Sequence, residues 1–155
     1  MNRKTILLTL VALFAAVTVC VAADDVNMGT WKLNEAKSKF APGSGKNTTV
    51  VYTAAGDNIK VTVDGVGADG KATHNEWTGK FDGKDYPVTG DSSADTRSYK
   101  RVNSHTLDLT NKKGGKVTLT GHIVVAADGK SRTVTTSSTD DKGKKIRNTA
   151  VYDKQ

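Results

Sequence analysis

The stretch Arg97-Ser98-Tyr99 holds the strongest candidates for recognition chemistry in this sequence. We predict that it lies in a β-strand, where alternate side chains point to the same side, so Arg97 and Tyr99 would share one face. An arginine presents a planar fork of donors to a carboxylate or phosphate, and a tyrosine adds a hydroxyl donor. Turned inward, the pair would bind a ligand in a cavity. The alternative is a solvated outer face that also includes Arg101.

Trp77 is a further candidate, in the middle of another predicted strand with Asn75 and Gly79 on its face. Its indole ring could form a flat platform for a ligand. The alternative is that Trp77 fills the core, because aromatic residues make up only 6% of the chain and each is needed for packing.

The three histidines suggest a metal site only weakly. His74 and Glu76 share a strand face and could supply two ligands, whereas His105 and His122 fall on other predicted strands. A catalytic zinc site needs three protein ligands in a defined geometry. We therefore expect no metal and no other cofactor.

Motifs of the common enzyme classes are missing from the sequence. It has no nucleophile elbow, no glycine-rich phosphate loop before a helix and no His-Glu helix motif. Its basic residues alternate with aspartates instead of forming the concentrated stripe that nucleic acid requires. We expect a binding protein with no catalytic residues and no nucleic-acid partner. An acid pair assembled by the fold is the enzymatic alternative.

Residues 1–23 have the pattern of a secretory signal peptide. A basic start at Asn2-Arg3-Lys4 precedes an uncharged run over 5–21, and Val21-Ala22-Ala23 offers a cleavage site. Cleavage near Ala23 would leave one domain, 24–155, exported to the periplasm or the extracellular space. No stable membrane span would remain after this processing.

Two alternatives to cleavage concern the same segment. A retained anchor would use an apolar run of about 17 residues, the short limit for crossing a bilayer. A lipoprotein would carry its lipid on Cys20, but Val19 stands where a small residue is needed. Cleavage removes Cys20, the only cysteine, so the exported domain would have no disulfide and would depend on its core alone. Loss of Arg3 and Lys4 lowers the net charge from +7 to +5.

From about residue 48 onward the chain has the pattern of consecutive strands, and one earlier strand is predicted at 29–34. Threonine and valine are frequent, apolar and polar residues alternate, and turn signals such as Ala55-Gly56-Asp57 and Ala127-Asp128-Gly129 recur about every ten residues. The predicted strands are 29–34, 48–54, 58–64, 71–80, 85–88, 96–102, 105–110, 116–126, 131–139 and 145–153.

Short Asp-Gly turns join antiparallel neighbours, so this pattern predicts an all-β, up-and-down meander. Closing the meander removes its two exposed edges, and we expect an antiparallel barrel of about eight to ten strands. One connection, 35–46, is longer. Asn34 could cap a single helical turn there, and Phe40 could either tuck over the barrel mouth or staple a surface loop.

The alternation also predicts space inside the barrel. Val61 and Val63 oppose polar neighbours on one strand, and Val117, Leu119 and Ile123 do so on another. These apolar residues are of medium size, and a ten-strand barrel is wider than side chains alone can fill. We therefore expect a cavity, and a small apolar or amphipathic ligand in it.

Two segments of the chain support a family resemblance. Gly29-Thr30-Trp31-Lys32-Leu33 resembles the G-x-W start of the calycins, which include the lipocalins and the intracellular fatty-acid-binding proteins. The closing stretch Thr149–Lys154 is similar to the last strand of the fatty-acid-binding proteins, which carries an Arg-x-Tyr pair inside the barrel. The opening is also similar to that of a bacterial group of exported lipocalin-like proteins of unassigned activity.

The resemblance implies a ten-strand barrel with Trp31 closing its narrow end and Tyr152 lining its interior. Ala150 stands where the family's carboxylate-binding arginine would be, and the connection 35–46 is too short for the two-helix lid of the fatty-acid-binding proteins. Those proteins are also cytosolic, whereas we expect export.

The ligand-lining candidates are Arg97, Tyr99, Tyr152, Asn148 and Trp77. The alternative function is an envelope-associated or secreted interaction protein or inhibitor, which would act through surface loops such as 35–46 or 90–95 on a filled barrel. The sequence does not identify a protein partner for it.

Overall fold

A computed structural model describes residues 25–140 and 142–155 of the chain. The expected signal peptide, with Cys20 and the cleavage site at Ala23, therefore lies outside the described residues. The structure has ten strands and one short 3-10 turn, η2 (Glu35–Lys37). The strands are β1 (Gly29–Leu33), β2 (Lys46–Ala55), β3 (Asn58–Val66), β4 (Ala72–Gly79), β5 (Tyr86–Thr89), β6 (Thr96–Asn103), β7 (Thr106–Lys113), β8 (Lys116–Val125), β9 (Ser131–Thr139) and β10 (Lys145–Lys154).

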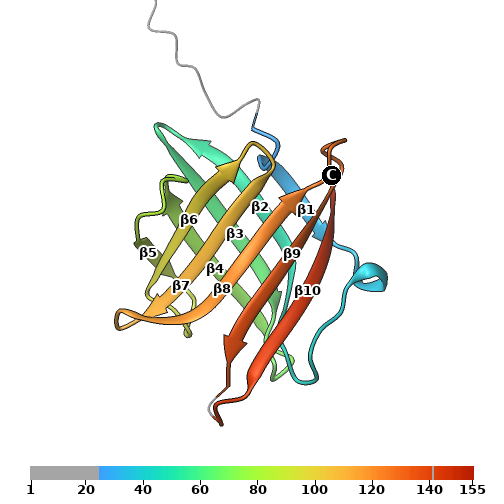
Figure 1. Cartoon of the computed structure of the whole chain (residues 1–155), viewed down its shortest axis with the longest axis vertical. Coiled ribbons are helices and arrows are strands. Elements are labelled where there is room, and N and C mark those ends of the chain that lie inside the picture. Colours follow the sequence, from blue (N-terminus) through green and yellow to red (C-terminus); the bar gives the residue numbers. More distant parts are fainter. Residues whose placement is uncertain (1–24, 141) are drawn as a thin grey trace, which may run out of the picture.

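Every strand pairs antiparallel with its neighbours in sequence, and β1 pairs with β10 to close the barrel (Figure 1). This confirms the prediction of an all-β, up-and-down closed barrel, and the fold is consistent with a calycin-like architecture. Closure leaves no free strand edge in the ring, which is the physical reason why so many short hairpins can form one stable unit. The predicted short fifth strand exists but is shifted by one residue, from 85–88 to Tyr86–Thr89.

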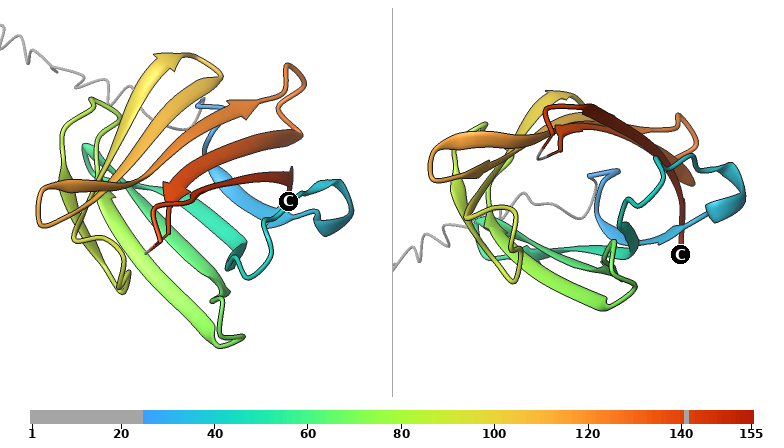
Figure 2. Two further views of the ribbon diagram at one scale, coloured as in Figure 1. Left: turned by 60° about the horizontal axis from the view of Figure 1, so that its bottom comes forward. Right: turned by 90° about the horizontal axis from the view of Figure 1, so that it is seen from below.

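The two ends of the barrel differ. The β9–β10 hairpin, the β7–β8 hairpin and the β5–β6 loop are at one end, which we call the mouth (Figure 2, right, looks into the barrel from this end). The described N-terminal residues, from Asp25, and the end of the chain lie at the other end, which we call the floor (Figure 1). The connection from β1 to β2, with η2, runs outside the wall beside β10.

That connection forms as its sequence predicts. The Asn34 side chain accepts a hydrogen bond of 3.2 Å from the backbone N–H of Lys37, which caps the turn. Lys39 then pairs with Thr149 of β10, so the segment is fastened to the barrel wall. Phe40 is half-buried and reaches the interior near the mouth.

One inward position was predicted wrongly. The alternation places Val117 beside Leu119 on the inner face, but Val117 is 57% exposed. A β-bulge separates them: Asn111 of β7 pairs with Leu119, while the next residue, Lys112, pairs with Val117. The extra residue, Thr118, reverses the alternation and turns Val117 to solvent.

The floor is closed by aromatic packing. Trp31 is completely buried, and its Nε1–H donates to the backbone oxygen of Asn27 at 2.8 Å. The Lys154 ammonium lies 5.2 Å from the ring centroid and donates to the oxygen of Val26. Trp31 therefore has the packing role expected of it, joining the first strand, the last strand and the N-terminal turn.

Candidate functional site

A cavity of about 460 Å³ occupies the barrel between the floor and the mouth. Its lining includes four of the five residues that the sequence predicts as ligand-binding: Arg97, Tyr99, Asn148 and Tyr152. The interior is not filled by side chains, because a ring of ten strands is wider than the eight-strand barrel that side chains can just fill. The cavity is therefore the candidate site.

The cavity wall changes in character from the floor to the mouth, when inward residues are followed along each strand. The innermost layer is formed by Tyr52, Tyr99, Arg132 and Tyr152. An aliphatic layer follows, made of Val50, Val63, Leu109, Ile123, Val134 and Ala150. The mouth layer is largely polar and includes Thr73, Asn75, Asn111, Thr136, Ser138 and Asn148. A ligand along the axis would meet polar, apolar and again polar surroundings.

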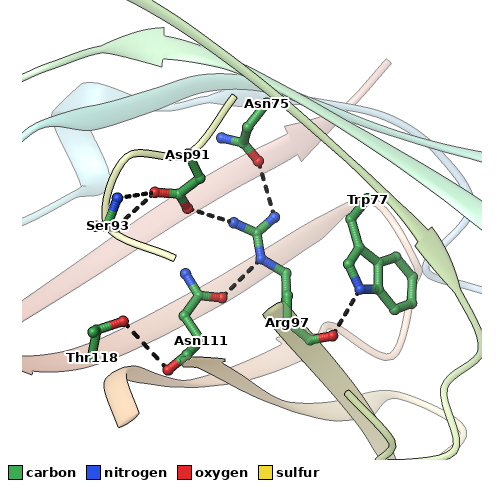
Figure 3. A network of polar contacts seen from close by, with 7 residues as sticks. All are labelled: Asn75, Trp77, Asp91, Ser93, Arg97, Asn111 and Thr118. Atoms are coloured by element: carbon green, nitrogen blue, oxygen red, sulfur yellow. Dashed lines mark hydrogen bonds and ion pairs between the residues drawn. The ribbon is translucent and has the colours of Figure 1, made fainter. Parts of the chain in front are cut away.

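Arg97 lies at the centre of a buried polar network (Figure 3). Its Nε donates to Asn111 Oδ1 at 2.8 Å, its Nη1 to Asn75 Oδ1 at 3.0 Å, and its Nη2 to Asp91 Oδ2 at 3.0 Å. Each guanidinium nitrogen thus has an acceptor, and the one carboxylate among the residues described around the cavity neutralises the charge. This arginine holds β4, β6, β7 and the β5–β6 loop together.

Gly90 allows the β5–β6 loop to reach Arg97. It has a φ of +79°, and a Cβ built there would lie 2.3 Å from the backbone oxygen of His74. Only glycine permits both this conformation and this close approach. Asp91 follows directly and bridges to Arg97, while its other oxygen caps the turn at Ser93 (Figure 3).

Trp77 lies beside the cavity without being part of its described lining. It is 1% exposed, and its Nε1–H donates to the backbone oxygen of Arg97 at 2.8 Å (Figure 3). Its ring packs edge-on against Tyr99, with centroids 4.8 Å apart, and is stacked on Phe81. These contacts place Trp77 in the core, supporting Tyr99 from behind.

Arg132 is the residue that the sequence reasoning missed. It is 2% exposed, and its guanidinium carbon lies 4.7 Å from the ring centroid of Trp31 and 5.0 Å from those of Tyr52 and Tyr152. Its Nε and Nη1 have no hydrogen-bond partner among the described residues. Aromatic rings attract the positive charge of a guanidinium but do not replace conventional hydrogen-bond acceptors.

The sequence signal for Arg132 was weak. Strand β9 contains a single aliphatic residue, Val134, among serines and threonines, so its alternation does not say which face is inside. Arg132 is two residues before Val134, so their side chains point to the same face of β9. This spacing is the one sequence signal that could have identified Arg132 as an inward residue. The partners of Arg97 were missed for another reason, since Asn75, Asp91 and Asn111 come from three different segments.

Tyr99 and Tyr152 remain protonated over the physiological range, because each has a raised pKa. Burial raises the pKa of Tyr152 to about 12, against the opposing effect of the Arg132 charge. Burial likewise raises the pKa of Tyr99, with the neighbouring Tyr52 adding to the effect. The Tyr152 hydroxyl donates to the oxygen of Asn47 at 3.0 Å. These phenols therefore act as neutral hydrogen-bonding groups.

Asn148 lines the cavity, but its oxygen is already engaged: Oδ1 accepts a hydrogen bond of 2.8 Å from the backbone N–H of Ala41. It thus fixes the connection between β1 and β2 to the wall, and its amide nitrogen is the group that it can offer to the interior. Ala150, where the resemblance would place an arginine, lines the cavity without charge.

His74 and His122 face outward and pair with carboxylates, whereas His105 Nδ1 is buried without a hydrogen-bond partner among the described residues. His74 Nδ1 is 2.6 Å from Asp64, whose hydrogen bond raises the His74 pKa, and His122 Nδ1 is 2.7 Å from Asp108. No cluster of three or more His, Cys, Asp or Glu side chains suited to a metal occurs in residues 25–140 and 142–155.

The charge around the cavity favours anions. The charged residues in its described lining are Lys46, Asp91, Arg97 and Arg132, of which Asp91 is bound to Arg97. Lys46 pairs with Glu35 at the surface, with its ammonium 2.9 Å from the carboxylate. What remains at the floor is the guanidinium of Arg132, a buried positive charge without a carboxylate.

Within the described part of the chain, no helix has the length and apolar character needed to cross a membrane. A comparison with models of known protein families gives no match, and a comparison with curated proteins finds no significantly similar sequence.

Proposed function

We propose that this protein is an exported, lipocalin-like carrier that holds a small apolar or amphipathic ligand inside its barrel. The observation that supports this proposal is the cavity of about 460 Å³, a volume in the range of known small-molecule sites. An aliphatic layer between two polar layers fits a ligand with both apolar and hydrogen-bonding parts. Export rests on the signal-like pattern of residues 1–23.

The alternative function is an inhibitor or interaction protein that acts through its loops, and it assumes a barrel filled by side chains. The open interior weakens that interpretation. The β5–β6 loop, one of its two candidate surfaces, is tied inward by the Asp91–Arg97 ion pair. We therefore place the carrier function first.

Native mass spectrometry of the protein purified from its export compartment, followed by extraction of bound compounds, tests the proposal. We expect a stoichiometric small molecule. An apo mass that does not change on adding fatty acids, long-chain alcohols or other amphiphiles would contradict it and would favour a partner that binds the loops.

A pair of variants connects such binding to the cavity. Ala150→Phe introduces a ring into the aliphatic layer and should abolish binding, because Ala150 is 6% exposed and lines the cavity. Val124→Phe adds the same ring on the outer face, where Val124 is 39% exposed, and should leave binding unchanged. Equal binding by both variants would place the ligand outside the barrel.

A further inference from the structure

We propose that Arg132 is an anion-binding residue and that the ligand is a small organic acid, bound with its carboxylate at the floor of the barrel. This inference rests on the proposed carrier function and names the chemical class of its ligand. It also assigns different roles to the two buried arginines, of which only Arg132 would bind the ligand.

The first support is the unsatisfied guanidinium. Arg132 is almost completely buried, yet its Nε and Nη1 lack hydrogen-bond acceptors within the described structure. A buried charge without hydrogen bonds is costly, and proteins rarely keep one unless it serves a ligand or a partner. The residue belongs to the lining of the cavity, so a ligand inside can reach it.

The second support is how the rings surround the guanidinium. Trp31, Tyr52 and Tyr152 lie within 4.7 to 5.0 Å of its central carbon. Aromatic rings attract the positive charge but do not replace conventional hydrogen-bond acceptors, so the N–H groups of Nε and Nη1 remain available to an acceptor on a ligand. A carboxylate is the acceptor that matches this fork with two parallel hydrogen bonds.

The third support is the charge balance. Asp91 is the only carboxylate in the described lining, and it is bound to Arg97 at 3.0 Å. No residue described around the cavity is left to neutralise Arg132. A ligand anion would supply the missing charge, and a cationic ligand would meet repulsion from both arginines.

The layers above the floor define the rest of the ligand. The aliphatic layer, with Val50, Leu109 and Val134, would hold a short hydrocarbon or ring body. The amides and hydroxyls nearer the mouth would bind a polar group at the far end. We therefore expect an organic acid with an apolar middle, and a second polar group should strengthen binding.

The test compares three probes with the same ten-carbon chain: decanoate, decanol and decyltrimethylammonium. Binding to the wild-type protein is measured by isothermal titration calorimetry and by tryptophan fluorescence, to which Trp31 contributes beside Arg132. We expect decanoate to bind about tenfold or more tightly than decanol, the effect of a charge-assisted hydrogen bond. Decyltrimethylammonium should bind most weakly.

Arg132→Met should remove the preference for decanoate while decanol still binds. Arg147→Met is the matched control, because it deletes one positive charge from an exposed position on β10 and should keep the preference. If Arg132→Met does not fold, nitrogen-15 NMR of the wild-type arginine side chains replaces it. The Arg132 Nε–H signal should then shift with decanoate and not with decanol.

The outcomes separate the two proposals. Equal binding of decanoate and decanol, or an unchanged preference in Arg132→Met, would overturn the role of Arg132 and leave the carrier function standing. Absence of binding by all three probes, together with an apo mass for the purified protein, would overturn both.

Discussion

Arg97 and Arg132 are both buried inside the same barrel, but their surroundings are opposite. Arg97 donates to two asparagines and an aspartate and is electrically balanced (Figure 3). Arg132 is enclosed by aromatic rings, and two of its nitrogens have no described acceptor. The difference shows that burial alone does not identify a ligand-binding arginine. The unused hydrogen-bonding capacity does.

The two arginines also differ in what they connect. The partners of Arg97 come from β4, β7 and the β5–β6 loop, so its loss would remove the polar contacts that join these elements inside the barrel. Arg132 lies at the floor between Trp31 and Tyr152, which packing already holds in place. One arginine serves the fold, and the other is available for recognition.

The largest expected effect is a difference in folding stability between variants of these two arginines. Arg97→Met leaves Asn75 and Asn111 buried, and Asp91 half-buried, without their partner and should lower the free energy of unfolding by about 3 kcal/mol or more. Arg132→Met removes no described hydrogen bond and should change it by about 1 kcal/mol or less, because lost cation–π contacts are offset by a smaller desolvation cost.

Urea unfolding followed by circular dichroism measures both changes. A loss in Arg132→Met as large as that in Arg97→Met would show that Arg132 is also structural, and the contrast between the two arginines would disappear.

The second effect is a loss of folding stability at alkaline pH, caused by Tyr152 at the floor of the barrel. The pKa of Tyr152 is about 12 in the folded protein, against the ordinary value of 10.0 for a solvated tyrosine, so the unfolded chain loses this proton first as pH rises. The contribution of Tyr152 to stability is therefore complete below pH 10 and decreases by about 2 to 3 kcal/mol between pH 10 and 12.

Unfolding experiments across this interval should show a shallower decline in Tyr152→Phe than in the wild type. Lysines titrate in the same range in both proteins, so only the difference between the two curves is informative. Parallel curves would argue that the Tyr152 hydroxyl is not buried at the floor.

A smaller effect concerns the loop that supplies Asp91. Gly90→Ala should destabilise the protein by about 2 kcal/mol or more, because a positive φ disfavours a side chain and the new Cβ would collide with the oxygen of His74. Gly70→Ala is a close control, with a φ of +80° and open space around its Cβ, and should cost only about 1 kcal/mol. Thermal melts of the two variants measure the difference, and equal losses would mean that the loop can move away from β4.

The smallest effect is expected on the outside of the barrel. Lys60 and Glu76 form an ion pair of 2.9 Å, but each side chain is 41% exposed. Lys60→Ala should change stability by about 0.5 kcal/mol or less, since water screens the pair. A loss comparable with that of Arg97→Met, measured by the same urea titration, would contradict the distinction between inner and outer ion pairs.

Much of the fold follows from local sequence. The alternation of residues 58–64 predicts which side of β3 is buried, and Val61 and Val63 are buried as expected. The asparagine cap of η2 also follows from sequence. Val117 does not follow, because the bulge that turns it outward depends on how β7 and β8 pair and not on either strand alone.

The candidate site likewise has a part that local sequence predicts and a part that it does not. Arg97 and Tyr99 lie on one strand, and the sequence predicted that they share a face. It left open whether that face points inward or to solvent, and in the structure both residues are buried. Trp77, predicted as ligand lining, lies behind that lining, because the neighbouring rings of Tyr99 and Phe81 stand against it. Arg132 carries no distinctive neighbours in sequence, so its position at the floor becomes visible only when β9 is placed beside β10.

The sequence by itself determined the strand order and the hairpin turns, because alternation and turn residues act over a few positions. It also limited the supply of large side chains, and with that the possibility of a filled barrel. Only the tertiary structure decided which face is inside, which carboxylate neutralises which arginine, and which guanidinium is left without a described acceptor. These outcomes depend on contacts between strands that are distant in sequence, such as Arg97 with Asn75 and Arg132 with Trp31.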